Sequence, residues 1–242
     1  MFRKEFIKVK KQGKDKITWR SHEPLRVEAL SDAVFGFAVS LLIISLEVPK
    51  TSGELLESLK GFFPFVCCFA LIFYIWFEQY VFFRRYGMHD LGTIVLNAAL
   101  MLVILFYVYP LKFLFNSALL HRGTIEDNDL TPLLLVYHGG FTCIYLLYTL
   151  MYCNAFKRRE ELQLNAIEIF ETRTSIFMFL GITCVGILLL IVALFTGRNG
   201  FVSMGLYSLI GPVMMIVSGR RDKLFRKKFG NAPMEEPHLG TD

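Results

Sequence analysis

Long stretches without a single charged side chain constrain the fold of this chain more than any other feature of its sequence. A soluble domain of this size would spread its apolar residues along amphipathic elements, whereas here they come in blocks. About 20 apolar residues in a helix cross a bilayer, where only helices or closed barrels satisfy their backbone. We therefore predict an all-α membrane protein. The five long stretches are 61–77, 91–111, 131–156, 174–197 and 199–219.

A sixth, shorter stretch lies nearer the start of the chain. Residues 33–46 are uncharged, and Asp32 and Glu47 flank them. This stretch extends about 21 Å as a helix at ~1.5 Å per residue, less than the ~30 Å hydrocarbon core. A helix exposed to lipid on all sides would not place two carboxylates so close together. We expect this helix to face other helices or water, and with it six membrane-spanning helices are predicted.

The boundaries of the predicted helices follow from prolines and from the charged residues between the stretches. Pro24 is typical of a first helical turn, and Pro49 ends the first helix. Residues 158–173 are expected to lengthen the fourth or the fifth helix. We expect a basic arm over 1–20, a six-helix transmembrane domain over 21–219 and a tail over 220–242. The six helices are expected at about 24–48, 61–86, 89–116, 130–156, 174–197 and 200–219.

The distribution of Lys and Arg predicts the orientation of the helices. Six crossings place both ends of the chain on one side, and all but five of the 26 basic residues fall on that side. Cytoplasmic segments carry the excess of Lys and Arg, so both termini are predicted to be cytoplasmic. We attribute the net charge of +5 to this topology and to anionic lipid headgroups, and not to nucleic-acid binding. The five exceptions are Lys50, Lys60, Lys112, Arg122 and Arg198.

The sequence shows no pattern typical of catalysis or of a metal site. The five His residues are scattered, and the five Cys residues all fall inside predicted helices. There is no Ser-His-Asp arrangement, metal motif or phosphate-binding loop. We therefore expect no enzymatic activity, no metal site and no cofactor.

The first helix carries an apolar stripe. Five apolar residues recur at spacings of three and four, so they fall on one side of a helix of ~3.6 residues per turn. Against a partner helix, this stripe is ordinary core. Around a symmetry axis, it forms stacked apolar rings in a water path, and such rings gate ions by dewetting. The pattern alone leaves both interpretations open. The stripe consists of Val34, Phe37, Leu41, Ile44 and Val48, with Ser40 at its edge.

Polar residues at the start of the same helix need partners elsewhere. Arg26 and Asp32 are six positions apart, so they point to different sides of the helix and cannot form a local pair. At the membrane edge, the carboxylate needs a donor from another helix. Such a network either only holds the helix at its tilt or also supports a channel. The candidates on the second and third helices are Trp76, Gln79, Tyr80 and Asn97.

This segment resembles a known family. The motif Arg26-x-x-x-Leu30-Ser31-Asp32 is similar to the Arg-x-x-x-Phe-Ser-Asp signature of the transmembrane protein 175 family, the potassium channels of endolysosomes and their bacterial homologues. The resemblance is strong over about 26–49 and weaker over about 70–110. Trp76, Leu96-Asn97 and Pro110 also fit, whereas Leu30, Phe37, Gln79 and Tyr80 depart from the family pattern.

The resemblance implies a homotetramer of six-helix subunits in a bacterial plasma membrane. The first helix of each subunit would line a central pore that has no filter of backbone carbonyls. Its expected partners are further copies of the chain, the bilayer and permeant monovalent cations, with K⁺ preferred modestly because an apolar ring offers no ligands to replace water. The implied constriction is Phe37, Leu41 and Ile44 with a hydroxyl ring at Ser40, and the implied anchors of the helix are Arg26, Ser31, Asp32, Trp76 and Asn97.

Two other classes remain open at this point. A secondary transporter usually shows internal repeats and charged residues in the middle of the membrane, and neither is present in this sequence. A regulatory membrane protein without transport activity would need no such features. A stable tetramer with the first helix at its axis would favour the channel.

Overall fold

The computed structural model of the chain describes residues 26–44, 51–53, 56, 59, 61–120, 130–196 and 205–229. Nearly all of these residues are helical and none lies in a β-strand, which confirms the predicted all-α class over this part of the chain. The helices are α2 (Arg26–Ile44), α4 (Phe62–Tyr86), α5 (Leu91–Leu120), α6 (Leu130–Lys157), α7 (Ala166–Thr196) and α9 (Ile210–Phe229), with a short 3-10 helix η3 (Leu206–Leu209) before α9. The predicted N-terminal arm over 1–20, residues 45–50 and the tail from 230 lie outside the described residues.

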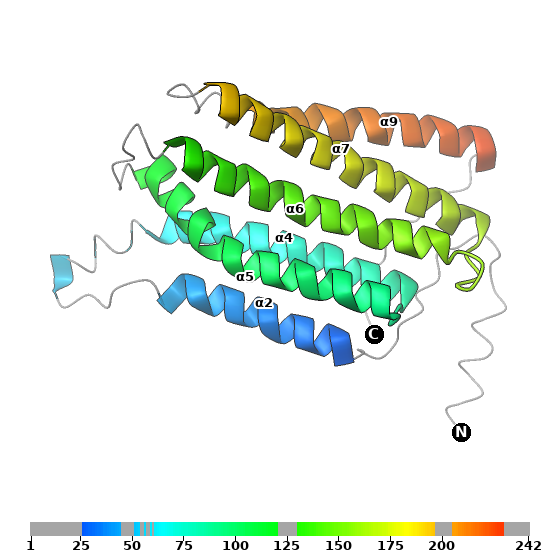
Figure 1. Ribbon diagram of the computed structural model, residues 1–242, viewed down its shortest axis with the longest axis horizontal. Helices are drawn as coiled ribbons and strands as arrows, with labels where there is room; N and C mark the ends of the chain where they lie inside the picture. The colour runs from blue at the N-terminus through cyan, green and yellow to red at the C-terminus, as the bar shows by residue number, and fades with distance from the viewer. Residues whose placement is uncertain are drawn as a thin grey trace.

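Successive long helices run antiparallel and form a bundle (Figure 1). Helix α2 packs against α4 and α5, α6 packs on α5 and α7, and α9 packs on α7 and η3. Helices α2 and α9 therefore lie on opposite sides of the bundle (Figure 1). The starts of α2, α5 and α7 and the ends of α4, α6 and α9 share one end. We call this the basic end, because it carries Arg84, Arg85, Arg158, Arg159, Arg220 and Arg221.

Four of the described helices are long and apolar enough to cross a bilayer. They correspond to the predicted second, third, fourth and fifth spans. Helix α2, whose 19 residues include Arg26, Glu28 and Asp32, is not among them. Helix α9 is not among them either, because its second half is strongly basic. The four spans are Phe62–Tyr86, Leu91–Asn116, Thr131–Lys157 and Ala166–Phe195.

Helix α7 begins earlier than the apolar stretch it contains. The backbone N–H of Asn165 donates to Glu168 Oε2 at 2.9 Å, and the N–H of Glu168 donates to Asn165 Oδ1 at 2.8 Å. This reciprocal capping box satisfies two donors that a helix start otherwise leaves free. The prediction that residues 158–173 lengthen a neighbouring helix is therefore confirmed from Ala166 onward.

Helix α9 continues ten residues past Gly219, where the last helix was predicted to end. The predicted end was wrong because the charged segment beyond it forms an amphipathic helix, with apolar residues on one side. Phe225 is only 3% exposed and its ring lies 5.7 Å from that of Phe170. Arg221 Nη2 lies 2.7 Å from Glu171 Oε1. These contacts hold the basic half of α9 on α7.

A polar cluster at the basic end connects α5 to α6. Asp90 Oδ1 accepts a hydrogen bond from Thr93 Oγ1 at 2.7 Å, and Oδ2 accepts one from Asn154 Nδ2 at 3.1 Å. Arg158 Nη2 lies 3.3 Å from the same Oδ2. Burial raises the pKa of the Asp90 carboxyl, but the hydrogen bonds from Thr93 and Asn154 and the Arg158 charge outweigh it and lower the pKa overall.

Candidate functional site

Helix α2 has one buried face. Ser31, Ala38 and Leu42 are fully buried, and Phe35 is only 4% exposed. Their spacing of four, three and four residues places all of them on one side of the helix. This side packs against α4 and α5. The face of α2 that contacts the rest of the subunit is therefore fixed by these four residues.

A chain of buried hydrogen bonds runs from α2 through α5 to α4. Asn97 Nδ2 donates to Ser31 Oγ at 2.8 Å, and Gln79 Nε2 donates to Asn97 Oδ1 at 2.5 Å. Ser31 Oγ in turn donates to the Val27 carbonyl at 2.8 Å. Ser31 and Asn97 are fully buried and Gln79 is nearly so. Buried polar groups are costly unless paired, so this chain of partners specifies how the three helices meet.

Asp32 bonds to a different one of the polar residues that the sequence suggested as its partners. Trp76 Nε1 donates to Asp32 Oδ1 at 2.7 Å, which joins α2 to α4 beside the buried chain. The Tyr80 ring stacks on the Trp76 ring with centroids 5.6 Å apart, and the Tyr80 hydroxyl accepts from Arg84 Nη1 at 2.9 Å. Tyr80 thus supports the indole and does not bond to Asp32 itself. Arg26 is exposed and takes part in none of these hydrogen bonds.

Sequence reasoning missed a contact at the opposite end of α2. Lys112 Nζ on α5 donates to the Leu42 carbonyl at 3.0 Å. The last carbonyls of a helix lack partners within the helix and carry a partial negative charge, which a cation stabilises. A signal was present in the sequence, because Lys112 is the one charged residue between 91 and 120.

The face of α2 opposite the buried one has no partner within the described subunit. Phe37 is 55% exposed and Ile43 is 52% exposed, and Gly36 and Ser40 between them are exposed as well. The Ser40 hydroxyl donates to the Gly36 carbonyl at 2.9 Å.

The residues of the predicted apolar stripe therefore differ in their exposure. Phe37 is exposed, whereas Leu41 is half-buried and packs against the core. The side chain of Ile44 is outside the described part of the chain. The exposed face carries Gly36, Phe37, Ser40 and Ile43, so Phe37 is the one member of the predicted constriction, among the side chains that the structure describes, that lies on it.

Comparison with known proteins identifies the family of this chain. Residues 26–107, which cover α2, α4 and most of α5, match a family described as "Endosomal/lysosomal potassium channel TMEM175". A potassium channel from Marivirga tractuosa is 38% identical in an alignment of 221 residues that covers 84% of this chain and 89% of that protein. The chain belongs to the TMEM175 family. The resemblance expected from Arg26, Ser31 and Asp32 is thus confirmed, and the chain is an integral membrane protein.

A second relative and a solved structure similar to this chain are also described as potassium channels. A potassium channel from Chamaesiphon minutus is 26% identical in an alignment of 139 residues that covers 54% of this chain and 64% of that protein. The crystal structure of the potassium channel MtTMEM175, a T38A variant in complex with a nanobody-MBP fusion protein, matches with a TM-score of 0.77 and 35% identity. The match covers 86% of this chain and 98% of that one. These relatives are channels and not enzymes.

Proposed function

We propose that this chain is the subunit of a potassium-preferring cation channel whose pore is lined by α2. The observation that carries the proposal is the two-sided character of this helix. One face is fixed to α4 and α5 by buried hydrogen bonds, and the other presents Gly36, Phe37, Ser40 and Ile43 to the outside of the subunit. The named relatives, which are potassium channels, favour the same function.

The channel would be a homotetramer of subunits that each cross the membrane six times. One helix from one subunit cannot enclose a pore, so several copies of α2 must meet at an axis. An outward face of Gly and Ser allows helices to approach closely, and Phe37 and Ile43 would bury against neighbouring copies or line the pore. Helix α9, on the far side of the subunit, would then lie at the periphery.

Side chains of α2 would form the narrowest part of the pore. The residues proposed for the constriction are Phe37, Leu41 and Ile44, with the Ser40 hydroxyl as a polar ring among them. Apolar rings offer no oxygen ligands, so an ion passes only after losing part of its hydration shell. Because K⁺ loses water more readily than Na⁺, a modest preference for K⁺ is expected without any carbonyl filter or bound cofactor.

The polar residues at the start of α2 would hold the constriction in place. Ser31 and Asp32 are bonded to Asn97 and Trp76, on α5 and α4 respectively. Arg26 is exposed in the single subunit, and in this proposal it contacts a neighbouring copy of the chain or the membrane surface. By the distribution of Lys and Arg, the basic end would face the cytoplasm of a bacterial cell.

The proposal is tested by reconstituting the purified protein into phosphatidylcholine liposomes and recording flux of K⁺ and Na⁺. We expect a K⁺ flux larger than the Na⁺ flux, and a change in their ratio in the Phe37→Ala variant. The matched control is Phe113→Ala, which removes an exposed Phe from α5. Absence of flux in both the wild type and Phe37→Ala, or a monomer by native mass spectrometry, would contradict the channel.

A further inference from the structure

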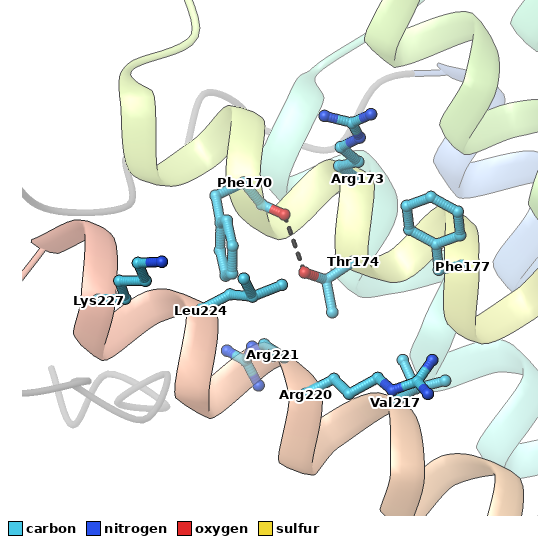
Figure 2. Close-up of a pocket in the computed structure, with 9 residues that line it drawn as sticks. All are labelled: Phe170, Arg173, Thr174, Phe177, Val217, Arg220, Arg221, Leu224 and Lys227. Atoms are coloured by element: carbon cyan, nitrogen blue, oxygen red, sulfur yellow. Dashed lines mark hydrogen bonds between the residues drawn. The ribbon is translucent and has the colours of Figure 1, made fainter.

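An open cavity of about 820 Å³ lies between α7 and α9 at the basic end of the bundle (Figure 2). It belongs to neither the α2 face nor the buried hydrogen-bond chain. Its walls combine two kinds of side chain, namely aromatic or aliphatic groups and cations. The apolar ones are Phe170, Phe177, Val217 and Leu224, and the basic ones are Arg173, Arg220, Arg221 and Lys227.

The cavity is held open by contacts along its inner side. Phe225 packs its ring against Phe170, and Arg221 forms an ion pair with Glu171. The Thr174 hydroxyl donates to the Phe170 carbonyl at 2.9 Å, which fixes its position on α7 (Figure 2). These contacts join α9 to α7 along one line and leave the outer parts of both helices uncovered.

The cavity carries uncompensated positive charge. Glu171 neutralises Arg221, but Arg173, Arg220 and Lys227 form no ion pair with a carboxylate among the residues that the structure describes. All three are exposed. Beside them, Phe177 is 53% exposed and Leu224 is 56% exposed. The surface therefore offers three free cations directly next to an apolar wall.

We propose that this cavity binds one anionic phospholipid. The cations that line the cavity, Arg220, Lys227 and Arg173, would attract the phosphate, since guanidinium and ammonium groups form charge-assisted hydrogen bonds to phosphate oxygens. An acyl chain would lie along Phe177 and Leu224. Basic pockets between transmembrane helices are typical binding sites for anionic headgroups.

The position of the cavity in the fold favours a lipid over a soluble anion. Helix α9 is apolar from Ile210 to Val217 and basic from Arg220 onward, so the cavity lies where hydrocarbon gives way to headgroups. A soluble anion would use the cations but not the apolar wall. This inference rests on the membrane placement in the proposed function, in which α7 and α9 face lipid on the side of the subunit away from α2.

The experiment measures lipid retention by native mass spectrometry of the full-length protein in micelles that contain equal amounts of phosphatidylglycerol and phosphatidylcholine. We expect phosphatidylglycerol to be retained selectively. The Arg220→Gln/Lys227→Gln variant should bind it about thirtyfold more weakly, because each of the two cations contributes roughly 1 kcal/mol to anionic lipid binding and about 1.4 kcal/mol corresponds to a factor of ten. The control, Lys157→Gln/Lys223→Gln, removes the same charge from exposed positions outside the cavity and should change binding by less than about twofold.

A second arm separates a lipid from a soluble phosphate. Glycerol 3-phosphate carries the same phosphate without acyl chains, and we expect no displacement of the lipid by it. Displacement by glycerol 3-phosphate, equal retention of phosphatidylcholine, or equal loss of binding in both double variants would each overturn the proposal. Ion flux in pure phosphatidylcholine liposomes is measured without the anionic lipid, so failure of the channel proposal and failure of the lipid site give different results.

Discussion

Asn97 donates a hydrogen bond of 2.8 Å to the hydroxyl of Ser31, although 66 positions separate them in the chain. Both side chains are fully buried, and Asn97 also accepts from Gln79. This amide is thus the point at which α2, α4 and α5 are joined. Ser31 belongs to the buried face of α2, opposite the face that we propose to line the pore.

Replacing Asn97 with Leu should destabilise the protein. The variant keeps a similar volume but leaves the Ser31 hydroxyl and the Gln79 amide with one partner fewer in a buried place. We expect a loss of about 1–3 kcal/mol, because hydrogen bonds in membrane proteins contribute modestly while an unpaired buried polar group costs more. Thermal unfolding in detergent measures this loss. Ser40→Ala is the control, since that exposed hydroxyl bonds only within its own helix, and an equal loss there would contradict the prediction.

Lys112 should stabilise the last turn of α2. Lys112→Met keeps most of the side chain and removes the donor to the Leu42 carbonyl, at an expected cost of about 0.5–1 kcal/mol for a cation at a helix C-terminus. Hydrogen exchange of the amides of α2 measures the effect locally, and the last turn should exchange faster while the first turn is unchanged. Lys112→Arg, which retains a donor, should exchange more slowly than Lys112→Met. Identical exchange in all three proteins would show that the contact is not stabilising.

Asp90 should make stability depend on acid pH. Its pKa is lower in the folded protein than the usual 3.8, so the ionised carboxylate stabilises the fold above that value and the stabilisation is lost as the pH falls through the folded pKa. Unfolding temperatures of the wild type and Asp90→Asn, recorded between about pH 6 and pH 2.5, should differ at the upper end and converge at the lower end. A constant difference over this range would show that the charge of Asp90 is not responsible.

Two adjacent glycines on α6 should respond oppositely to alanine. A Cβ on Gly140 would overlap the ring of Tyr107 on α5, whereas a Cβ on Gly139 would meet no atom within 4 Å. Gly140→Ala should cost about 1–3 kcal/mol through overpacking. Gly139→Ala should be neutral or stabilise by up to about 1 kcal/mol through helix propensity. Comparison of the two unfolding temperatures checks the packing of α5 on α6, and equal values would contradict it.

Much of the helix pattern could be predicted from the sequence. The spans from 61 to 197 follow from uncharged stretches of sufficient length, because a bilayer forces each such stretch into a helix. The end of α9 could not be predicted in this way. Charged residues after Gly219 looked like a tail, and only the contacts of Phe225 and Arg221 with α7 show why the helix continues.

The sequence predicted which residues belong to the site better than it predicted how they pair. Trp76, Gln79, Tyr80 and Asn97 could be named as candidates because few polar groups lie near the start of α2, but which of them bonds to Asp32 depends on helix rotation. Trp76 does, and Asn97 bonds to Ser31 instead. The apolar stripe could be found by period alone, whereas its division into exposed Phe37 and half-buried Leu41 required the packed neighbours.

The sequence by itself determined that this chain is an all-helical membrane protein and, through Arg26, Ser31 and Asp32, the family to which it belongs. Both follow from local properties: the length of uncharged stretches and a short motif. The tertiary structure alone decided which face of α2 is buried, which polar groups pair, and that Arg220 and Lys227 line one cavity together with Phe177. The physical reason is that helix rotation and helix pairing depend on side chains far apart in the chain.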